Sequence, residues 1–171
     1  RHFKLDGAAH KLHLWHVKLT GADISSNSNG SDGSGGSILI DVNSGEVNLY
    51  YSEISGNKAK VGGAIYGGRN SANSLIVNVY NTVIKDNEAT MNGGAMYIYN
   101  SVLTIKDTTI DNNEAGDTAG GVRIQLSDGT ITNTIIKNND AGSDGGGLYI
   151  RDDTSTVIIR QSTFTSNTAT G

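Results

Sequence analysis

The chain has 171 residues, of which 36% are hydrophobic and 18% are charged, and its formal net charge is −4. This size suits one domain with a long, thin core, and the acidic balance argues against a nucleic-acid-binding surface. The sequence contains no cysteine, which excludes disulfides and thiolate metal sites, and no stretch approaches the roughly 20 apolar residues of a membrane span.

The first segment with a strand pattern covers residues 12–19, where Leu12 and Leu14 are spaced by two. This spacing is typical of a β-strand with one buried face. The four histidines all lie in or before this segment: His2, His10, His13 and His16. The last three are spaced by three residues, so neighbours would point to opposite faces of a strand, and a shared metal site would need a bend.

Two segments interrupt the pattern that follows. Residues 25–37 are rich in Ser, Asn, Gly and Asp, and residues 67–74 lengthen a later unit. We expect both segments to project from the fold as loops. The first of them contains Asn29-Gly30-Ser31, which is the one acceptor-type glycosylation sequon of the chain.

From residue 54 onward, one motif recurs five times: a large apolar residue, two others, Asn, one more residue and Ala. The copies start at Ile54, Ile84, Ile110, Ile136 and Phe164, and their asparagines are Asn57, Asn87, Asn113, Asn139 and Asn167. These asparagines are 30, 26, 26 and 28 residues apart. A period of 20–50 residues indicates a solenoid, whose units bury their apolar faces only by stacking on one another.

Two further signatures accompany the motif. Pairs spaced by two residues precede it, and they are Val47/Leu49, Val77/Val79, Leu103/Ile105, Gly129/Ile131 and Val157/Ile159. A double glycine that opens another apolar run begins at Gly62, Gly93, Gly120 and Gly145, with a poorer copy at Gly35. The glycines permit positive φ or close backbone approach at a corner. This run carries a candidate ladder that we expect to be partly exposed, made of Leu39, Tyr66, Tyr97, Ile124 and Tyr149.

These patterns predict an all-β fold, namely a right-handed parallel β-helix of about six coils with three short strands per coil, as a single domain over residues 1–171. The handedness follows from the crossover preference of parallel strands. We expect the motif asparagines at coil corners, in left-handed backbone conformations, with each amide bonded to the next coil. Because the chain ends where a sixth double glycine is due, we expect it to be part of a longer solenoid.

Function in a solenoid is sought among the outward residues that the repeat leaves free. One outward column reads Trp15, Tyr50, Tyr80, Lys106, Thr132 and Arg160, and we name it the aromatic–basic column. Aromatic rings beside long cations suit sugar rings and acidic polysaccharides, through stacking and charge-assisted hydrogen bonds. We interpret Trp15, Tyr50, Tyr80, Lys106 and Arg160 as candidate ligand-binding residues, and the alternative is that the rings only cover the sheet.

The residue after each motif asparagine forms a second column: Lys58, Glu88, Glu114, Asp140 and Thr168. Its three acids would repel one another by roughly 1 kcal/mol per neighbouring pair in water. Either they spread into solvent, or Glu88, Glu114 and Asp140 bind a structural Ca²⁺, since hard cations take carboxylate oxygens. We expect no other cofactor.

Two rival function classes stay open. An enzyme on this fold needs converging carboxylates or an acid–cation pair over a groove, and the sequence offers Lys106-Asp107 beside Arg160, and Asp152-Asp153. An ice-binding face needs regular hydroxyl columns. Ser52, Thr82, Thr108, Thr134 and Ser162 form one such column, although the columns beside it are charged or aromatic.

The alternation of [Phe/Ile]-x-x-Asn with Gly-Gly-Ala-[Ile/Leu/Met] resembles the repeats of the polymorphic outer membrane proteins and related autotransporter adhesins, within the pectate-lyase-like β-helix superfamily. The best matches are Gly62–Ile65, Gly93–Met96 and Phe164–Asn167. The resemblance covers residues 44–171 and, more weakly, residues 1–24. It implies a secreted or cell-surface passenger domain that works in adhesion, and it transfers no catalytic residue because the motifs are scaffold positions.

We therefore predict an extracellular or cell-surface binding module without catalytic activity. Its expected partner is a glycan or a surface protein, with no nucleic-acid partner and no membrane-spanning segment. The alternative is a polysaccharide lyase or glycoside hydrolase on the same fold, because one fold hosts many functions.

Overall fold

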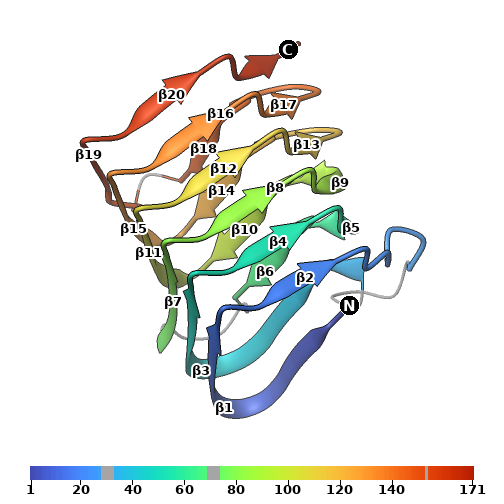
Figure 1. Cartoon of the computed structure of the whole chain (residues 1–171), viewed down its shortest axis with the longest axis vertical. Coiled ribbons are helices and arrows are strands. Elements are labelled where there is room, and N and C mark those ends of the chain that lie inside the picture. The colour runs from blue at the N-terminus through green and yellow to red at the C-terminus, as the bar shows by residue number, and fades with distance from the viewer. Residues whose placement is uncertain (28–32, 69–73, 153) are drawn as a thin grey trace.

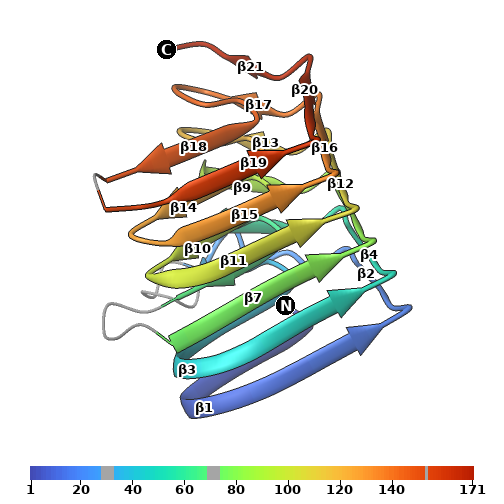
Figure 2. The same ribbon diagram turned by 90° about the vertical axis from the view of Figure 1, so that its left-hand side faces the viewer.

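The computed structural model describes residues 1–27, 33–68, 74–152 and 154–171, and it is a parallel β-solenoid (Figure 1). The described strands form three parallel sheets of ten, six and five strands. The N-terminal strands lie at one end of the stack and the C-terminal strands at the other (Figure 2). No helix in the described part of the chain is long and apolar enough to cross a membrane. The predicted all-β parallel solenoid is therefore confirmed.

The ten-stranded sheet covers two sides of the solenoid. One side contains the strands after the double glycines: β6 (Ile65–Gly67), β10 (Met96–Tyr99), β14 (Val122–Gln125) and β18 (Leu148–Arg151). The other side contains β7 (Ser74–Tyr80), β11 (Ser101–Lys106), β15 (Asp128–Thr132) and β19 (Val157–Arg160). The long strands β1 (Phe3–Trp15) and β3 (Ile38–Tyr50) pair with each other along both sides, and β3 joins the two sides because it pairs with both β6 and β7.

The other two sheets contain shorter strands. The six-stranded sheet consists of β2 (Lys18–Thr20), β4 (Glu53–Ser55), β8 (Val83–Lys85), β12 (Thr109–Asp111), β16 (Ile135–Lys137) and β20 (Thr163–Thr165). The five-stranded sheet consists of β5 (Lys58–Val61), β9 (Glu88–Asn92), β13 (Glu114–Ala115), β17 (Asp140–Ala141) and β21 (Thr168–Ala169). Each strand pairs with its counterpart in the next turn, as the repeat requires.

The turns are less uniform than the sequence suggested. Within the described residues, four turns share one set of four strands, β6–β9, β10–β13, β14–β17 and β18–β21, where about six coils of three strands were expected. The extra strand arises because a residue with positive φ breaks the chain direction between two strands. Asn100 lies between β10 and β11, and Leu126 lies between β14 and β15. In the two N-terminal turns, β1 and β3 run through this bend without a break (Figure 1).

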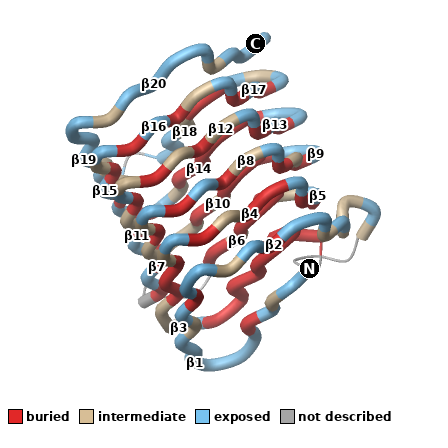
Figure 3. The backbone as a smooth tube through the Cα atoms, in the orientation of Figure 1, coloured by how far each residue is buried: buried red, intermediate tan, exposed pale blue. Residues whose placement is uncertain are grey.

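The core lies along the axis of the coil. The first three predicted inward pairs are no more than 1% exposed: Val47, Leu49, Val77, Val79, Leu103 and Ile105. The apolar residues of the first four Asn motifs, Ile54 to Ile136, are fully buried as well. Exposure rises at the ends of the stack: Leu12 in the first turn is partly buried, and Ile159 and Phe164 in the outermost C-terminal turn are 43% and 40% exposed (Figure 3).

The double-glycine strand of one turn departs from the expected register. Arg123, and not Ile124, pairs with Tyr97 and with Tyr149, so the expected ladder is wrong at that position. The reason is that Ala119, with φ of 62°, occupies the corner that Gly93 occupies one turn earlier. The corner Gly93-Gly94-Ala95 corresponds to Ala119-Gly120-Gly121 one turn later. An alignment made on the two glycines is therefore shifted by one residue in that turn.

The first expected loop does not project over its whole length. Residues 33–37 are buried, and the backbone N–H of Gly35 donates to the carbonyl of Val61 at 2.9 Å. Residues 28–32, with the sequon Asn29-Gly30-Ser31, lie outside the described residues, as do residues 69–73 of the second expected loop.

Candidate functional site

The corners before the motif asparagines and the corners that carry the hydroxyl column share one local structure. A residue with positive φ is followed by a polar residue whose side chain bonds the backbone. Before the motif asparagines, the positive-φ residues are Gly56, Asp86, Asn112, Asn138 and Ser166. The motif asparagines are not themselves left-handed, so that expectation was wrong: the residue before each of them reverses the chain.

The motif asparagines form a continuous buried ladder. Each side-chain Nδ2 donates to Oδ1 of the next motif asparagine at 2.9 Å, from Asn57 through to Asn167. The same Oδ1 atoms accept the backbone N–H of the preceding asparagine at 3.0–3.1 Å. The expected amide bonds between coils are therefore confirmed. These side chains stabilise the scaffold and are not available to a ligand.

The hydroxyl column is a second ladder at another corner. Each hydroxyl donates to the carbonyl two residues earlier at 2.7–3.0 Å. Most of them also accept a backbone N–H from the preceding turn, for example Thr82 N–H to Thr108 Oγ1 at 3.3 Å. Thr82, Thr108 and Thr134 are at most 2% exposed. An ice-binding face built on this column is therefore ruled out, because its hydroxyls are buried and occupied.

The aromatic–basic column exists as one row of paired residues. Strand pairing aligns Trp15 with Tyr50, Tyr50 with Tyr80, and then Lys106, Thr132 and Arg160 in turn. The Trp15 and Tyr50 ring centroids are 4.0 Å apart and those of Tyr50 and Tyr80 are 5.3 Å apart, both with 18° between the planes. Both faces of the Tyr50 ring are thus covered by its neighbours. The stack offers a ligand its edges, its hydroxyls and the outer face of Trp15, which is 54% exposed.

A second aromatic row lies directly beside this column, and the sequence had not indicated it. His16 and Tyr51 each follow a column residue and have φ of 52° and 49°. Their rings stack at 5.2 Å with 13° between the planes, and Trp15 lies 6.2 Å from Tyr51. Simple alternation would send these side chains inward, but the left-handed backbone turns them outward, and Tyr51 is 52% exposed.

A shallow groove of about 500 Å³ runs along this corner. It is lined by His16, Val17, Lys18, Tyr51, Ser52, Glu53, Asn81 and Val83. Oε1 of Glu53 lies 3.2 Å from Nζ of Lys18 and accepts a hydrogen bond from Ser55 Oγ at 2.9 Å. The Ser55 hydroxyl and then Lys18 hold the pKa of Glu53 below its usual range, so the groove carries a carboxylate at neutral pH.

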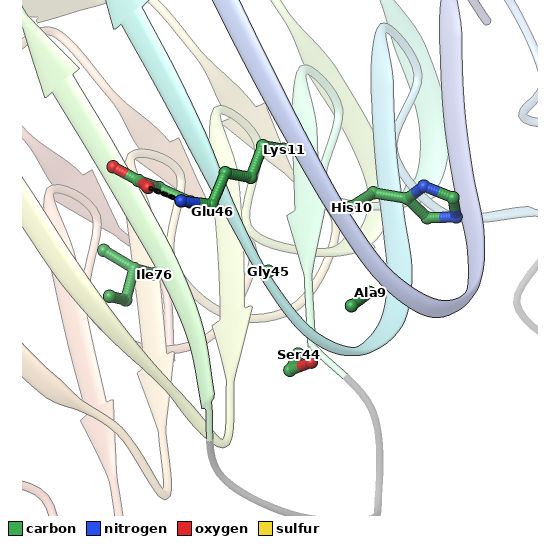
Figure 4. A pocket seen from close by; sticks show the side chains of 7 residues that line it. All are labelled: Ala9, His10, Lys11, Ser44, Gly45, Glu46 and Ile76. Atoms are coloured by element: carbon green, nitrogen blue, oxygen red, sulfur yellow. Dashed lines mark ion pairs between the residues drawn. The ribbon is translucent and has the colours of Figure 1, made fainter.

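Another hollow, of about 370 Å³, lies in the bend of β1 and β3 and is lined by Ala9, His10, Lys11, Ser44, Gly45, Glu46 and Ile76 (Figure 4). Nζ of Lys11 lies 3.6 Å from Oε2 of Glu46, and the His10 ring points away from this pair (Figure 4). One carboxylate neutralised by one lysine gives this hollow no second acid with which to perform hydrolysis.

The acidic column, for which calcium binding was one of two alternatives, lies in register along one sheet. Glu88, Glu114 and Asp140 pair in register, but Glu88 binds the Lys58 ammonium and Asp140 accepts a hydrogen bond from the Thr168 hydroxyl. Across the described ranges, no group of three or more His, Asp or Glu side chains is placed to hold a metal ion. Neighbours along the column bind the first and last of these acids, and calcium ligation by the three stays a prediction. The four histidines also make no such group.

Of the candidate catalytic groups, Lys106 and Asp107 lie side by side, and Arg160 lies apart from them. Nζ of Lys106 lies 4.0 Å from Asp107, whose carboxylate accepts a hydrogen bond from Asn133. Arg160 lies two turns from Lys106, with Thr132 between them. Asp153 lies outside the described residues, so the Asp152-Asp153 pair has no structural account.

The double-glycine side carries a cluster around one buried cation. Arg123 is 4% exposed, and its guanidinium carbon lies 4.9 Å from the Tyr97 ring centroid and 5.6 Å from that of Tyr149. It donates to Asn92, Thr118 and Gln125. Burial raises the pKa of nearby Tyr66 to about 12. These contacts bind neighbouring turns together and leave the guanidinium inaccessible to a ligand.

Comparison with known families agrees with this architecture. The family model described as a right handed beta helix region matches residues 72–171. The model of the Chlamydia polymorphic membrane protein repeat matches residues 51–68. No curated protein and no solved structure matches the chain.

Proposed function

We propose that this chain, which belongs to the right-handed β-helix family, is a non-catalytic cell-surface module that binds a glycan or a protein through its aromatic–basic column. The similarity of residues 51–68 to a repeat of polymorphic membrane proteins supports a place at the cell surface and a role in adhesion. This similarity does not identify a ligand, so we infer the class of ligand from the residues of the aromatic–basic column.

The observation that carries the proposal is the single outward row from Trp15 to Arg160. The stacked rings hold one another in place, and this lowers the conformational entropy that a ligand must remove on binding. Further along the same row, Lys106 and Arg160 are exposed cations. A chain-like ligand lying along the solenoid axis would meet ring edges first and charges later, which suits an acidic polysaccharide or an acidic protein segment.

A glycan array tests the glycan form of this proposal. We expect the wild-type chain to bind acidic glycans and the double variants Tyr50→Ala/Tyr80→Ala and Lys106→Gln/Arg160→Gln to lose about tenfold or more in affinity, which corresponds to about 1.4 kcal/mol. Lys60→Gln, which removes one cation from a different sheet where the lysine is exposed, is the control for loss of positive charge elsewhere. Unchanged binding by both double variants, or no glycan bound by the wild type, would contradict the glycan form.

The enzyme alternative is tested on the same material. A lyase would release unsaturated products from pectin-like or alginate-like polymers, and their ultraviolet absorbance would rise with time. We expect no such rise, because Arg160 lies two turns from the Lys106–Asp107 pair and brings no second catalytic group to it.

A further inference from the structure

We propose that the groove between Tyr51 and Asn81 is a subsite for one pyranose ring of a glycan, with Tyr51 as the stacking platform and Glu53 and Lys18 as hydrogen-bonding groups. This inference rests on the proposed function, since the sugar would belong to a ligand that also lies along the adjoining aromatic–basic column. It assigns the sugar contact to a row of residues outside that column.

The platform is a ring with one free face. Tyr51 has His16 stacked on the side of the preceding turn, at 5.2 Å between centroids. In the following turn, the equivalent left-handed position holds Asn81, which has no ring to cover the other face. Tyr50 differs, because it is stacked on both sides. The exposed half of Tyr51 therefore offers what the column itself lacks, a free aromatic face for the apolar face of a sugar.

The polar groups lie beside this face in the same groove. The contacts of Glu53 with Ser55, Lys18 and Lys85, at 2.9, 3.2 and 3.8 Å, all converge on Oε1 among the described residues. Its second oxygen, Oε2, retains acceptor capacity for sugar hydroxyls. The Lys18 side chain is 63% exposed and lies one turn before Glu53, in the turn of His16, so it offers a donor at that end of the groove. Hydrogen bonds in which sugar hydroxyls donate to a carboxylate or accept from an ammonium are stronger than those between neutral partners.

The size and composition of the groove suit a single ring. Its volume of about 500 Å³ falls within the roughly 300–1,000 Å³ of small-molecule sites. Val17 and Val83 line it together with the charged pair, and Val83 is 37% exposed. A pyranose has the matching character, with an apolar face of C–H groups and a polar rim of hydroxyls.

Saturation-transfer NMR with simple sugars tests the subsite directly. The probes are the methyl pyranosides of glucose, galactose, mannose and N-acetylglucosamine, added singly to the wild-type chain. We expect saturation of the ring C–H protons of at least one probe and an affinity about tenfold weaker in Tyr51→Ala. Tyr51→Phe, which keeps the ring, should stay within about twofold of wild type, and Glu53→Gln should weaken binding severalfold.

The matched control is Tyr99→Ala, which removes a ring from β10 on the double-glycine side and none from the column or the groove. It should leave saturation of the probe unchanged. Circular dichroism melting of each variant shows whether it is folded, and Tyr51→Phe and Glu53→Gln alter only outward side chains. Absence of saturation with every probe, or unchanged saturation in Tyr51→Ala, would overturn the subsite.

The two proposals fail in different ways. If the column variants abolish array binding and Tyr51→Ala leaves the probes bound, the subsite is wrong and the proposed function stands. If Tyr51→Ala abolishes probe binding while the column variants leave array binding unchanged, the subsite stands and the column is not the ligand surface.

Discussion

Each motif asparagine joins two turns through both ends of its amide. Asn113 accepts hydrogen bonds from the side chain and the backbone of Asn87, at 2.9 and 3.1 Å. Its own Nδ2 donates to Asn139 at 2.9 Å and to two backbone carbonyls. The residue is 1% exposed, so water cannot replace these bonds. A single side chain thus satisfies the backbone groups that the corner removes from the sheet ladder.

Replacement of Asn113 by Ala should therefore be costly. We expect Asn113→Ala to lower the free energy of unfolding by roughly 3–5 kcal/mol, because several buried polar groups lose their partners together. Asn167→Ala is the matched control in the outermost turn, where the side chain is only partly buried and water can substitute. Its loss should be less than half as large. Urea denaturation followed by circular dichroism measures both, and equal losses at the two sites would contradict a ladder that depends on burial.

The sequence could predict the role of these asparagines but not the conformation of their neighbours. Five copies of the motif show that an amide is required, and an amide can bond its counterpart one turn away. The left-handed residues before them are Gly, Asp, Asn, Asn and Ser, which share no single feature that a repeat search detects. The same limit concealed Tyr51, because its outward direction depends on φ and not on its place in an alternating pattern.

At the scale of strands and corners, hydroxyl side chains end one strand and position the next. Thr108 Oγ1 donates to the carbonyl of Lys106 at 2.9 Å and accepts the backbone N–H of Thr82 at 3.3 Å. Ser127 does the same before β15: its hydroxyl donates to the carbonyl of Gln125 and accepts the backbone N–H of Ser101. The Ser101 hydroxyl at the start of β11 donates to the carbonyl of Tyr99. The polar residue at each corner therefore substitutes for a ladder bond, and its hydroxyl is not available at the surface.

Thr108→Val tests this reading, since Val keeps the shape and removes the hydroxyl. We expect a loss of about 1–3 kcal/mol in the free energy of unfolding, because a carbonyl and an N–H lose their partner inside the corner. Thr108→Ser keeps the hydroxyl and should lose less than about 1 kcal/mol. Thermal denaturation of the three chains gives the comparison. If Thr108→Val were as stable as wild type, the ladder would contribute nothing to the corner.

The alternating strand patterns predicted which residues form columns, and this prediction failed where a corner differs from one turn to the next. The aromatic–basic column was correct through six turns because its residues lie within strands, where alternation holds. The ladder beside the double glycines failed at Arg123, because Ala119 adopts the left-handed corner usually given to Gly. The sequence also could not predict that both faces of the Tyr50 ring are covered, because stacking between turns depends on ring angles that no sequence pattern encodes.

The whole molecule is a stack in which each turn contacts its two neighbours. Sheet pairing runs from one turn to the next in all three sheets, and the core is a row of equivalent apolar side chains. The stability of such an array approximates a sum of turns and of interfaces between turns. Turns of equal length should therefore be exchangeable, provided that the ladders stay in register.

Removal of residues 114–139 tests this property at the scale of the molecule. The deletion takes out one 26-residue period and joins Asn113 to Asp140, so Asn113 would bond Asn167 and Tyr97 would pair with Tyr149. We expect a folded solenoid that is one turn shorter, with a denaturant m-value lowered by about the fraction of the chain removed, since m scales with the surface exposed on unfolding.

Removal of residues 114–126, half a period, is the control. This deletion misaligns every column after the junction and should abolish cooperative unfolding. Urea denaturation monitored by circular dichroism separates the two outcomes, and loss of structure in both chains would show that the turns are not interchangeable units.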